Sequence, residues 1–220
     1  MIWIIIGAVF LFSIIVQAVL KSKIKKYSKI KTNLTGAEIA EKMLRENGIY
    51  DVTVNQANGF LTDHYNPATK QVNLSTDVFN GNNIASVAIA AHECGHAVQH
   101  AKGYAPLKLR TALVPAVNFA NYTVQFVLLF GILLLERFPM LIWIGIGLFA
   151  ITTLFSFVTL PVEINASARA VRWLEGAGIT TYETKPMAVS ALKWAAYTNV
   201  IAALGSLATL LYYITIASRR

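Results

Sequence analysis

The chain has 220 residues, of which 55% are hydrophobic, and its mean hydropathy of +0.53 argues against an ordinary soluble domain and for a membrane protein. The net charge is +8, but the positive residues cluster beside a hydrophobic segment, which favours anionic lipid headgroups and not nucleic acid as their partner. The single cysteine, Cys94, excludes an intramolecular disulfide.

The first hydrophobic segment covers residues 2–20 and is long enough to cross a hydrocarbon core. No charged region precedes it and no A-x-A-like cleavage site follows, so we expect a retained transmembrane helix and not a signal peptide. Six lysines follow between Lys21 and Lys31, where we expect a solvated linker near lipid headgroups. By the positive-inside rule this flank is cytoplasmic.

A soluble α+β portion should follow, up to about residue 111. Thr35 and Glu38 fit a capping box, and the helix that they begin should end at Gly48. Alternation of apolar and polar residues predicts two short strands, near residues 52–54 and 71–75, in one or two hairpins. We expect the second strand to present its edge to an extended substrate peptide.

Between these strands, Asp63, His64 and Tyr65 stand side by side before a proline. One interpretation is an Asx-type turn with a structural histidine. The other is that His64 or Tyr65 reaches a metal site and stabilises the oxyanion of a tetrahedral intermediate. Asp63 would then fix the tautomer of His64.

The sequence His92-Glu93-Cys94-Gly95-His96 is an H-E-x-x-H motif. On a helix, residues four apart share a face, so both histidines could bind one Zn²⁺ while Glu93 takes a proton from a zinc-activated water. The alternative is an ordinary buried helix whose histidines are satisfied by hydrogen bonds. Cys94 should point away and pack, and His100, about 12 Å from His92 along the axis, is not expected to be a ligand.

Three further hydrophobic segments cover residues 111–135, 140–160 and 195–217. Within the first of these, Asn118, Asn121 and Gln125 fall on one helix face. Polar residues at that depth are expected to look into a helical bundle or a polar cavity and not into lipid.

Counting charges tests this arrangement. Four spans put residues 21–111 and 161–194 on one side of the membrane, and that side holds sixteen of the nineteen Lys and Arg residues. The other side holds Arg137, Arg219 and Arg220. The bias supports a cytoplasmic location for the H-E-x-x-H motif.

A catalytic zinc site usually has three protein ligands. Glu163, the first acidic residue after the third span, should emerge on the same side as the motif and is the best candidate. Ser167, one helical turn later, could hydrogen-bond a ligand. The alternative is that Glu163 forms an ion pair with Arg169 or with a lysine at the membrane interface, and His64 is the alternative third ligand.

Several stretches together resemble the YugP-like neutral zinc metallopeptidases, a family of bacterial membrane proteases. They occur in the family's order, as LTGAE (34–38), LTDHYNP (61–67), AAHECGHA (90–97) and LPVEINAS (160–167). The resemblance implies that His92 and His96 are zinc ligands, Glu93 is the catalytic base and Glu163 is the third ligand. The scheme is also similar to gluzincins of the HtpX and prenyl-protease type, which carry an acidic residue where this chain has Ser167.

We therefore expect a membrane α-helical bundle of about four transmembrane helices with a small α+β zincin-like metalloprotease portion on one side. The expected divisions are 1–20, 21–111, 112–160, 161–194 and 195–220. The predicted function is that of an integral plasma-membrane zinc endopeptidase with one Zn²⁺ per chain, its active site on the cytoplasmic side, acting on membrane-associated or unfolded polypeptides. A regulatory membrane partner or a homo-oligomer is compatible with this. The alternatives are a non-catalytic scaffold with a structural zinc closed by His64, and a membrane hydrolase of lipids or small amides.

Overall fold

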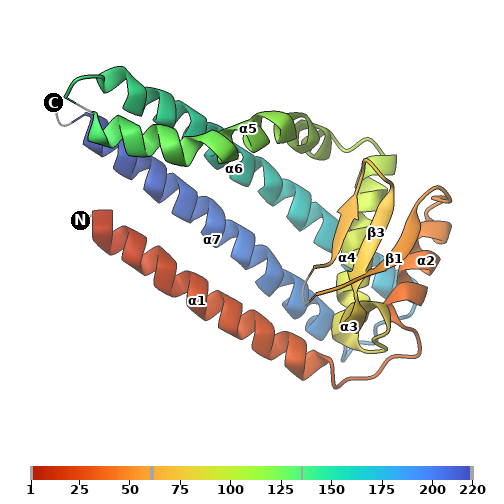
Figure 1. Ribbon diagram of the computed structural model, residues 1–220. Helices are drawn as coiled ribbons and strands as arrows, with labels where there is room; N and C mark the ends of the chain where they lie inside the picture. The colour runs from red at the N-terminus through yellow and green to blue at the C-terminus, as the bar shows by residue number, and fades with distance from the viewer. Residues whose placement is uncertain (1, 60–61, 135, 219–220) are drawn as a thin grey trace.

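The computed structural model of the protein describes residues 2–59, 62–134 and 136–218. Leu61, Leu135, Arg219 and Arg220, on which some of the expectations above fall, lie outside the described residues. The elements, in chain order, are α1 (Ile2–Tyr27), α2 (Gly36–Glu46), β1 (Thr53–Ala57), β2 (His64–Asn66), β3 (Gln71–Ser75), α3 (Thr76–Phe79), α4 (Ile84–Ala101), α5 (Ala105–Leu133), α6 (Pro139–Gly176) and α7 (Lys185–Ala217) (Figure 1).

Four of the described helices, α1, α5, α6 and α7, are long and apolar enough to cross a membrane, as the hydrophobic segments predict. They lie in a row in which α1 packs on α7, α7 on α6 and α6 on α5 (Figure 1). The small soluble elements gather at one end of this row. The two outer helices of the row, α1 and α5, therefore each have a side that no other long helix covers.

The long helices continue beyond the predicted hydrophobic segments. Residues 21–26, with four of the six lysines, are the last turns of α1, so the expectation of a solvated linker there is wrong. Lysine is a good helix former and no glycine or proline interrupts the run, so the helix continues to Tyr27. In the same way α6 runs unbroken through Pro161 to Gly176, so the third hydrophobic segment and the segment that carries Glu163 are one helix.

The first soluble helix, α2, forms as its capping signals predict. The Thr35 side chain accepts a hydrogen bond from the Glu38 backbone N–H, and the Glu38 carboxylate accepts one from the Thr35 N–H at 2.7 Å. Gly48, just after the helix, has φ +72°, a conformation in which a side chain is strained. The cap fixes where α2 begins and lays its buried face, which includes Ile39 and Met43, against α4.

The sheet is a three-stranded one with the order β1-β3-β2. β3 pairs with β1 in parallel and with β2 in antiparallel, with His64 opposite Asn73. Because β3 is central and both of its edges are paired, the expectation that it offers an edge to a substrate is wrong. The free edges belong to β1 and β2, and the one hairpin among the described strands joins β2 to β3.

The polar face of α5 does not look into the helical row. Asn118, Asn121 and Gln125 are exposed, whereas Val117 and Ala120 are buried. The expectation that the three amides face a bundle or an internal cavity is therefore wrong for the single chain. The apolar side of α5 packs on α6, because burial of apolar surface is favourable, and the exposed amides lie beside this contact.

Candidate metal centre

The centre begins with α4, the helix that occupies the middle of the soluble portion. Asn83 caps it by accepting a hydrogen bond from the Ser86 N–H at 3.0 Å. Its residues are mostly small and apolar, which lets α2 and α6 both pack closely against it. His92 and His96, one helical turn apart, lie edge to face with ring centroids separated by 4.8 Å.

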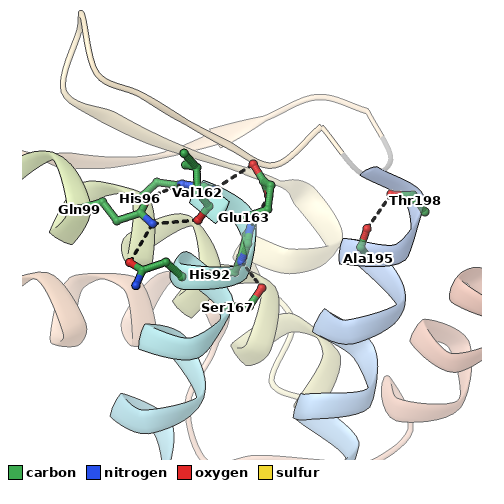
Figure 2. A network of polar contacts seen from close by, with 9 residues as sticks. His92, His96, Gln99, Val162, Glu163, Ser167, Ala195 and Thr198 are labelled. Carbon is green, nitrogen blue, oxygen red and sulfur yellow. Dashed lines mark hydrogen bonds and ion pairs between the residues drawn. The ribbon is translucent and has the colours of Figure 1, made fainter. Parts of the chain in front are cut away.

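Glu163 approaches the two histidines from α6 (Figure 2). Its Oε2 lies 3.2 Å from His92 Nε2 and its Oε1 lies 3.7 Å from His96 Nε2. A tetrahedral zinc with bonds of about 2.0–2.2 Å needs ligand atoms roughly 3.3–3.5 Å apart, so these separations suit the ion. The alternative ion pair with Arg169 is not formed, since that guanidinium donates to Asn165 Oδ1 instead. Two imidazoles and one carboxylate thus converge on a point between α4 and α6.

The second nitrogen of each imidazole is held by the protein. His92 Nδ1 lies 3.0 Å from Ser167 Oγ, the contact expected from the position of Ser167 one turn after Glu163. His96 Nδ1 lies 3.1 Å from Gln99 Oε1. An amide oxygen only accepts, so Nδ1 of His96 carries the hydrogen and its Nε2 presents a lone pair towards Glu163. Orienting a metal-binding histidine through its other nitrogen is typical of metal sites.

Gln99 is a residue of the site that sequence reasoning missed. It is fully buried, and its Nε2 donates to Val162 O at 2.8 Å and to Asn165 Oδ1 at 3.0 Å (Figure 2). A buried amide must be hydrogen-bonded, and here every partner belongs to the helix pair that holds the site. Its position three residues after His96, inside an apolar helix, was the available signal.

Gly95 lets the two helices come this close. A Cβ atom at this position would lie 2.6 Å from the backbone oxygen of Ala166 on α6. The backbone of α6 therefore occupies the space that the Cβ atom of any residue other than glycine at position 95 would need. The closeness of α4 and α6 at Gly95 sets the reach of Glu163 to the histidines.

The electrostatics of the site favour a positive charge. Burial alone would lower the pKa of His96, but the hydrogen bond that the protonated ring donates to Glu163, and the charges of Glu93 and Glu163, outweigh burial and raise the pKa. A proton or a metal cation could supply the positive charge. Taken with the lone pair of Nε2, this makes the three residues a fitting donor set for Zn²⁺.

The two inner residues of the motif have different surroundings. Glu93 is buried, with 8% of its surface exposed, and its carboxylate is not one of the three converging groups. Cys94 packs as expected: it is fully buried, its Sγ faces the backbone oxygen of Ala40, and burial raises the pKa of its thiol. A buried thiol of this kind is unreactive.

The Asp63-His64-Tyr65 stretch does not join the converging group. His64, the alternative third ligand, is exposed; its Nδ1 donates to Thr62 O at 2.8 Å and its Nε2 lies 3.2 Å from Asn73 Nδ2. Among the described residues, Asp63 accepts hydrogen bonds from the Ser75 N–H and hydroxyl and none from the His64 ring. The tautomer of His64 is set instead by the backbone oxygen of Thr62, to which its Nδ1 donates.

Tyr65 forms the remaining link from this stretch. Its hydroxyl is hydrogen-bonded to His100 Nδ1 at 2.8 Å, which connects β2 to the last turn of α4. His100 is hydrogen-bonded to Tyr65 and is not one of the three converging residues, which agrees with the expectation that it is not a ligand. This hydrogen bond holds β2 against the end of α4.

Comparison with known proteins identifies the family of this chain. The family model described as "putative neutral zinc metallopeptidase" matches residues 2–218. The chain is 42% identical over 202 residues to the "putative membrane protease YugP" of Bacillus subtilis (strain 168), a match that covers 91% of this chain and 89% of the relative. No solved structure matches the chain significantly. The chain belongs to the neutral zinc metallopeptidase family that its model describes.

Proposed function

We propose that this member of the neutral zinc metallopeptidase family is a multi-pass membrane endopeptidase that holds one Zn²⁺ through His92, His96 and Glu163. The observation that carries the proposal is the convergence of both Nε2 atoms on the carboxylate of Glu163, with each Nδ1 already engaged by Ser167 or Gln99. A pair of histidines held only for packing would not need a shared carboxylate and a hydrogen-bonding partner on each second nitrogen.

Three protein ligands support a catalytic site over a structural one. Structural zinc sites are closed by four protein ligands, whereas catalytic sites keep a position open for water or substrate. His64, which would have to complete a closed site, is not in the converging group. The scaffold function is therefore less well supported than the peptidase.

In the proposed reaction, zinc would supply a Lewis acid that polarises the substrate carbonyl and activates water. Glu93, next to His92 on the same helix and outside the ligand set, would accept a proton on its carboxylate from the attacking water. It would then deliver this proton to the amine nitrogen that leaves. His64 and Tyr65 remain the candidates for stabilising the oxyanion, after movement of the β2 segment towards the bound substrate.

The proposed location is the plasma membrane, with the site on the cytoplasmic side, because the positive charges gather on the side that carries the motif. A peptidase at that surface would act on membrane-associated or unfolded polypeptides. A free edge on β2, which contacts α4, supports access by an extended peptide.

One feature favours a second candidate, hydrolysis of a lipid or a small amide. A cavity of about 500 Å³ lies between α6 and α7, and it is lined mainly by apolar side chains. Ser167, which contacts His92, is part of its wall. An acyl chain bound there would approach the metal centre from the membrane side. Assays should therefore offer acyl amides beside polypeptides.

The decisive experiment compares the purified protein with the Glu93→Gln variant. Glutamine keeps the shape of the side chain but cannot take a proton, so we expect about one zinc per chain in both proteins and a loss of cleavage by about 10²–10⁴-fold in the variant. Zinc is measured by mass spectrometry and cleavage with unfolded casein. Glu41→Gln, an exposed change on α2, is the matched control and should change neither quantity.

The possible results separate the candidates. A protein without zinc after purification in zinc would contradict the metal centre itself. Bound zinc without cleavage of any polypeptide would favour the scaffold, and cleavage of acyl amides alone would favour the second hydrolase. Equal cleavage by both proteins would remove Glu93 from the mechanism.

A further inference from the structure

The outer face of α5 carries three amide side chains without partners. Asn118, Asn121 and Gln125 are exposed, and within the described part of the chain none of them makes a hydrogen bond. By contrast, the Thr111 and Thr123 hydroxyls on the same helix bond to backbone carbonyls one turn earlier. Each amide therefore has both a donor and an acceptor unused.

The spacing of the amides is that of a helix–helix seam. Gln125 follows Asn118 by seven residues and Asn121 follows it by three, and Thr111 and Val114 extend the same pattern one heptad earlier. Positions a and d of a heptad line one side of a helix and meet the same positions of a partner. Val117 and Ala120, which are buried on the side of α5 that faces α6, lie roughly 100° round the helix from the centre of the seam.

The depth of the amides makes their isolation costly. At 1.5 Å per residue, Asn118 lies about 12 Å and Gln125 about 22 Å beyond Arg110, the last charged residue before the seam. A hydrocarbon core about 30 Å thick would enclose both positions. An amide without a hydrogen-bonding partner in hydrocarbon is strongly unfavourable, so a partner is expected there.

We propose that the partner is a second copy of this chain, bound through the α5 seam formed by Thr111, Val114, Asn118, Asn121 and Gln125. Asn and Gln amides both donate and accept, so a stripe of them is complementary to itself. Two copies in one membrane share an orientation, so a twofold axis along the membrane normal pairs α5 with α5 in parallel, each amide meeting its equivalent.

The position of α5 suits such a pair. It is an outer helix of the row, and no other described long helix covers its outer face (Figure 1). The charged residues at the start of α5 are off the seam. Lys108 lies roughly 80° round the helix from Asn118, and Arg110 packs over the Phe155 ring of α6. Pairing therefore brings no like charges together. The inference rests on the membrane arrangement of the proposed function but not on its peptidase activity.

The first test is disulfide cross-linking in native membranes. Val114→Cys places a thiol on the seam without removing an amide, and Phe119→Cys, 63% exposed and roughly 100° round the helix from Asn118, is the control. We expect Val114→Cys to give a cross-linked dimer and Phe119→Cys to stay monomeric. Cys94 is buried and does not interfere.

The second test removes the amides in the Val114→Cys background. The triple change Asn118→Leu, Asn121→Leu, Gln125→Leu should weaken dimerisation by about 10–100-fold. The matched control replaces the lipid-facing residues of the neighbouring exposed face, by Phe119→Leu, Phe126→Leu and Phe130→Leu, and should leave dimerisation unchanged.

Several outcomes would overturn the inference. These are the absence of a cross-link at Val114→Cys, equal cross-linking at Phe119→Cys, a cross-linked product whose mass shows a different partner, or a triple leucine variant that dimerises normally. Release of the protein from membranes by alkaline carbonate would instead overturn the membrane arrangement. Casein cleavage is measured separately, so failure of the peptidase is distinguishable from failure of the dimer.

Discussion

At the scale of single residues, the proposed zinc centre depends on groups that orient the nitrogens of His92 and His96. Ser167 and Gln99 engage Nδ1 of His92 and His96, so both Nε2 atoms turn towards Glu163. A ligand with a fixed tautomer and orientation loses less freedom when the metal binds. The contribution of each orienting group can be measured separately from that of the ligands.

Ser167→Ala should weaken zinc binding by about 10–100-fold, because Nδ1 of His92 loses its partner and the ring is free to turn or change tautomer. Zinc affinity is measured by competition with a chelator of known affinity. The control is Ser156→Ala on the same helix, whose hydroxyl bonds only to the Thr152 carbonyl one turn earlier. Ser167→Thr, which keeps the hydroxyl, should restore most of the affinity. If Ser167→Ala and Ser156→Ala bind zinc equally well, Ser167 has no orienting role.

How much of the centre could be predicted depends on how local each contact is. The shared face of His92 and His96 follows from helix geometry, so four residues of spacing suffice to predict it. Glu163 is 71 residues from His92 and could be proposed only from its place after a span. Gln99 was missed because its partners on α6 are more than sixty residues away, and its place in an apolar helix near His96 does not identify those partners.

At the scale of elements, the contact between α4 and α6 determines whether the three proposed ligands meet. Gly95→Ala would place a Cβ 2.6 Å from the Ala166 backbone oxygen, so the helices must separate. We expect a loss of about 1–3 kcal/mol in stability together with weaker zinc binding, since overpacking against backbone cannot be relieved by a side-chain rotation. Thermal unfolding in detergent, with and without zinc, measures both effects.

The control for this change is Gly147→Ala on α6, where an added Cβ meets no atom within 4 Å. It should leave zinc affinity unchanged and leave stability unchanged or raise it slightly, because alanine favours the helix over glycine by about 1 kcal/mol. Equal behaviour of the two variants would mean that the close approach at Gly95 is not required.

The sheet shows why elements were predicted less well than the motif. β2 covers only His64–Asn66 and has no apolar alternation, so its strand conformation comes from pairing with β3. The parallel pairing of β1 with β3 joins residues separated by a further strand in the chain, which local patterns do not encode. The capping box at Thr35 and Glu38, whose contacts are local, was predicted correctly.

At the scale of the whole molecule, hydropathy predicted four long apolar helices but not their arrangement. The row α1, α7, α6, α5 places the first and last helices of the chain side by side, which depends on packing between segments far apart in sequence (Figure 1). It also leaves the amides of α5 on an outer face. What the sequence does specify at this scale is the distribution of charge, and that distribution predicts an orientation.

With four membrane spans, the sequence places sixteen of the nineteen Lys and Arg residues on the side of the proposed metal centre, so we expect this side to be cytoplasmic. The prediction can be tested with single cysteines and a membrane-impermeant maleimide. Arg137→Cys, in the turn between α5 and α6, should be labelled in intact cells. Lys29→Cys, just after α1, should be labelled only after the cells are opened. Cys94 is buried and stays silent.

Tyr50, whose side chain is 79% exposed, gives a second test of the same side. Like Lys29→Cys, Tyr50→Cys should be labelled only after the cells are opened. The reverse pattern, with Lys29→Cys and Tyr50→Cys labelled from outside, would move the metal centre to the outer surface. The substrates would then be secreted or surface polypeptides, and the zinc would be acquired outside the cell. Labelling of Lys29→Cys and Arg137→Cys from the same side would instead contradict the spanning of α5, because α5 is the one long described helix between the two positions.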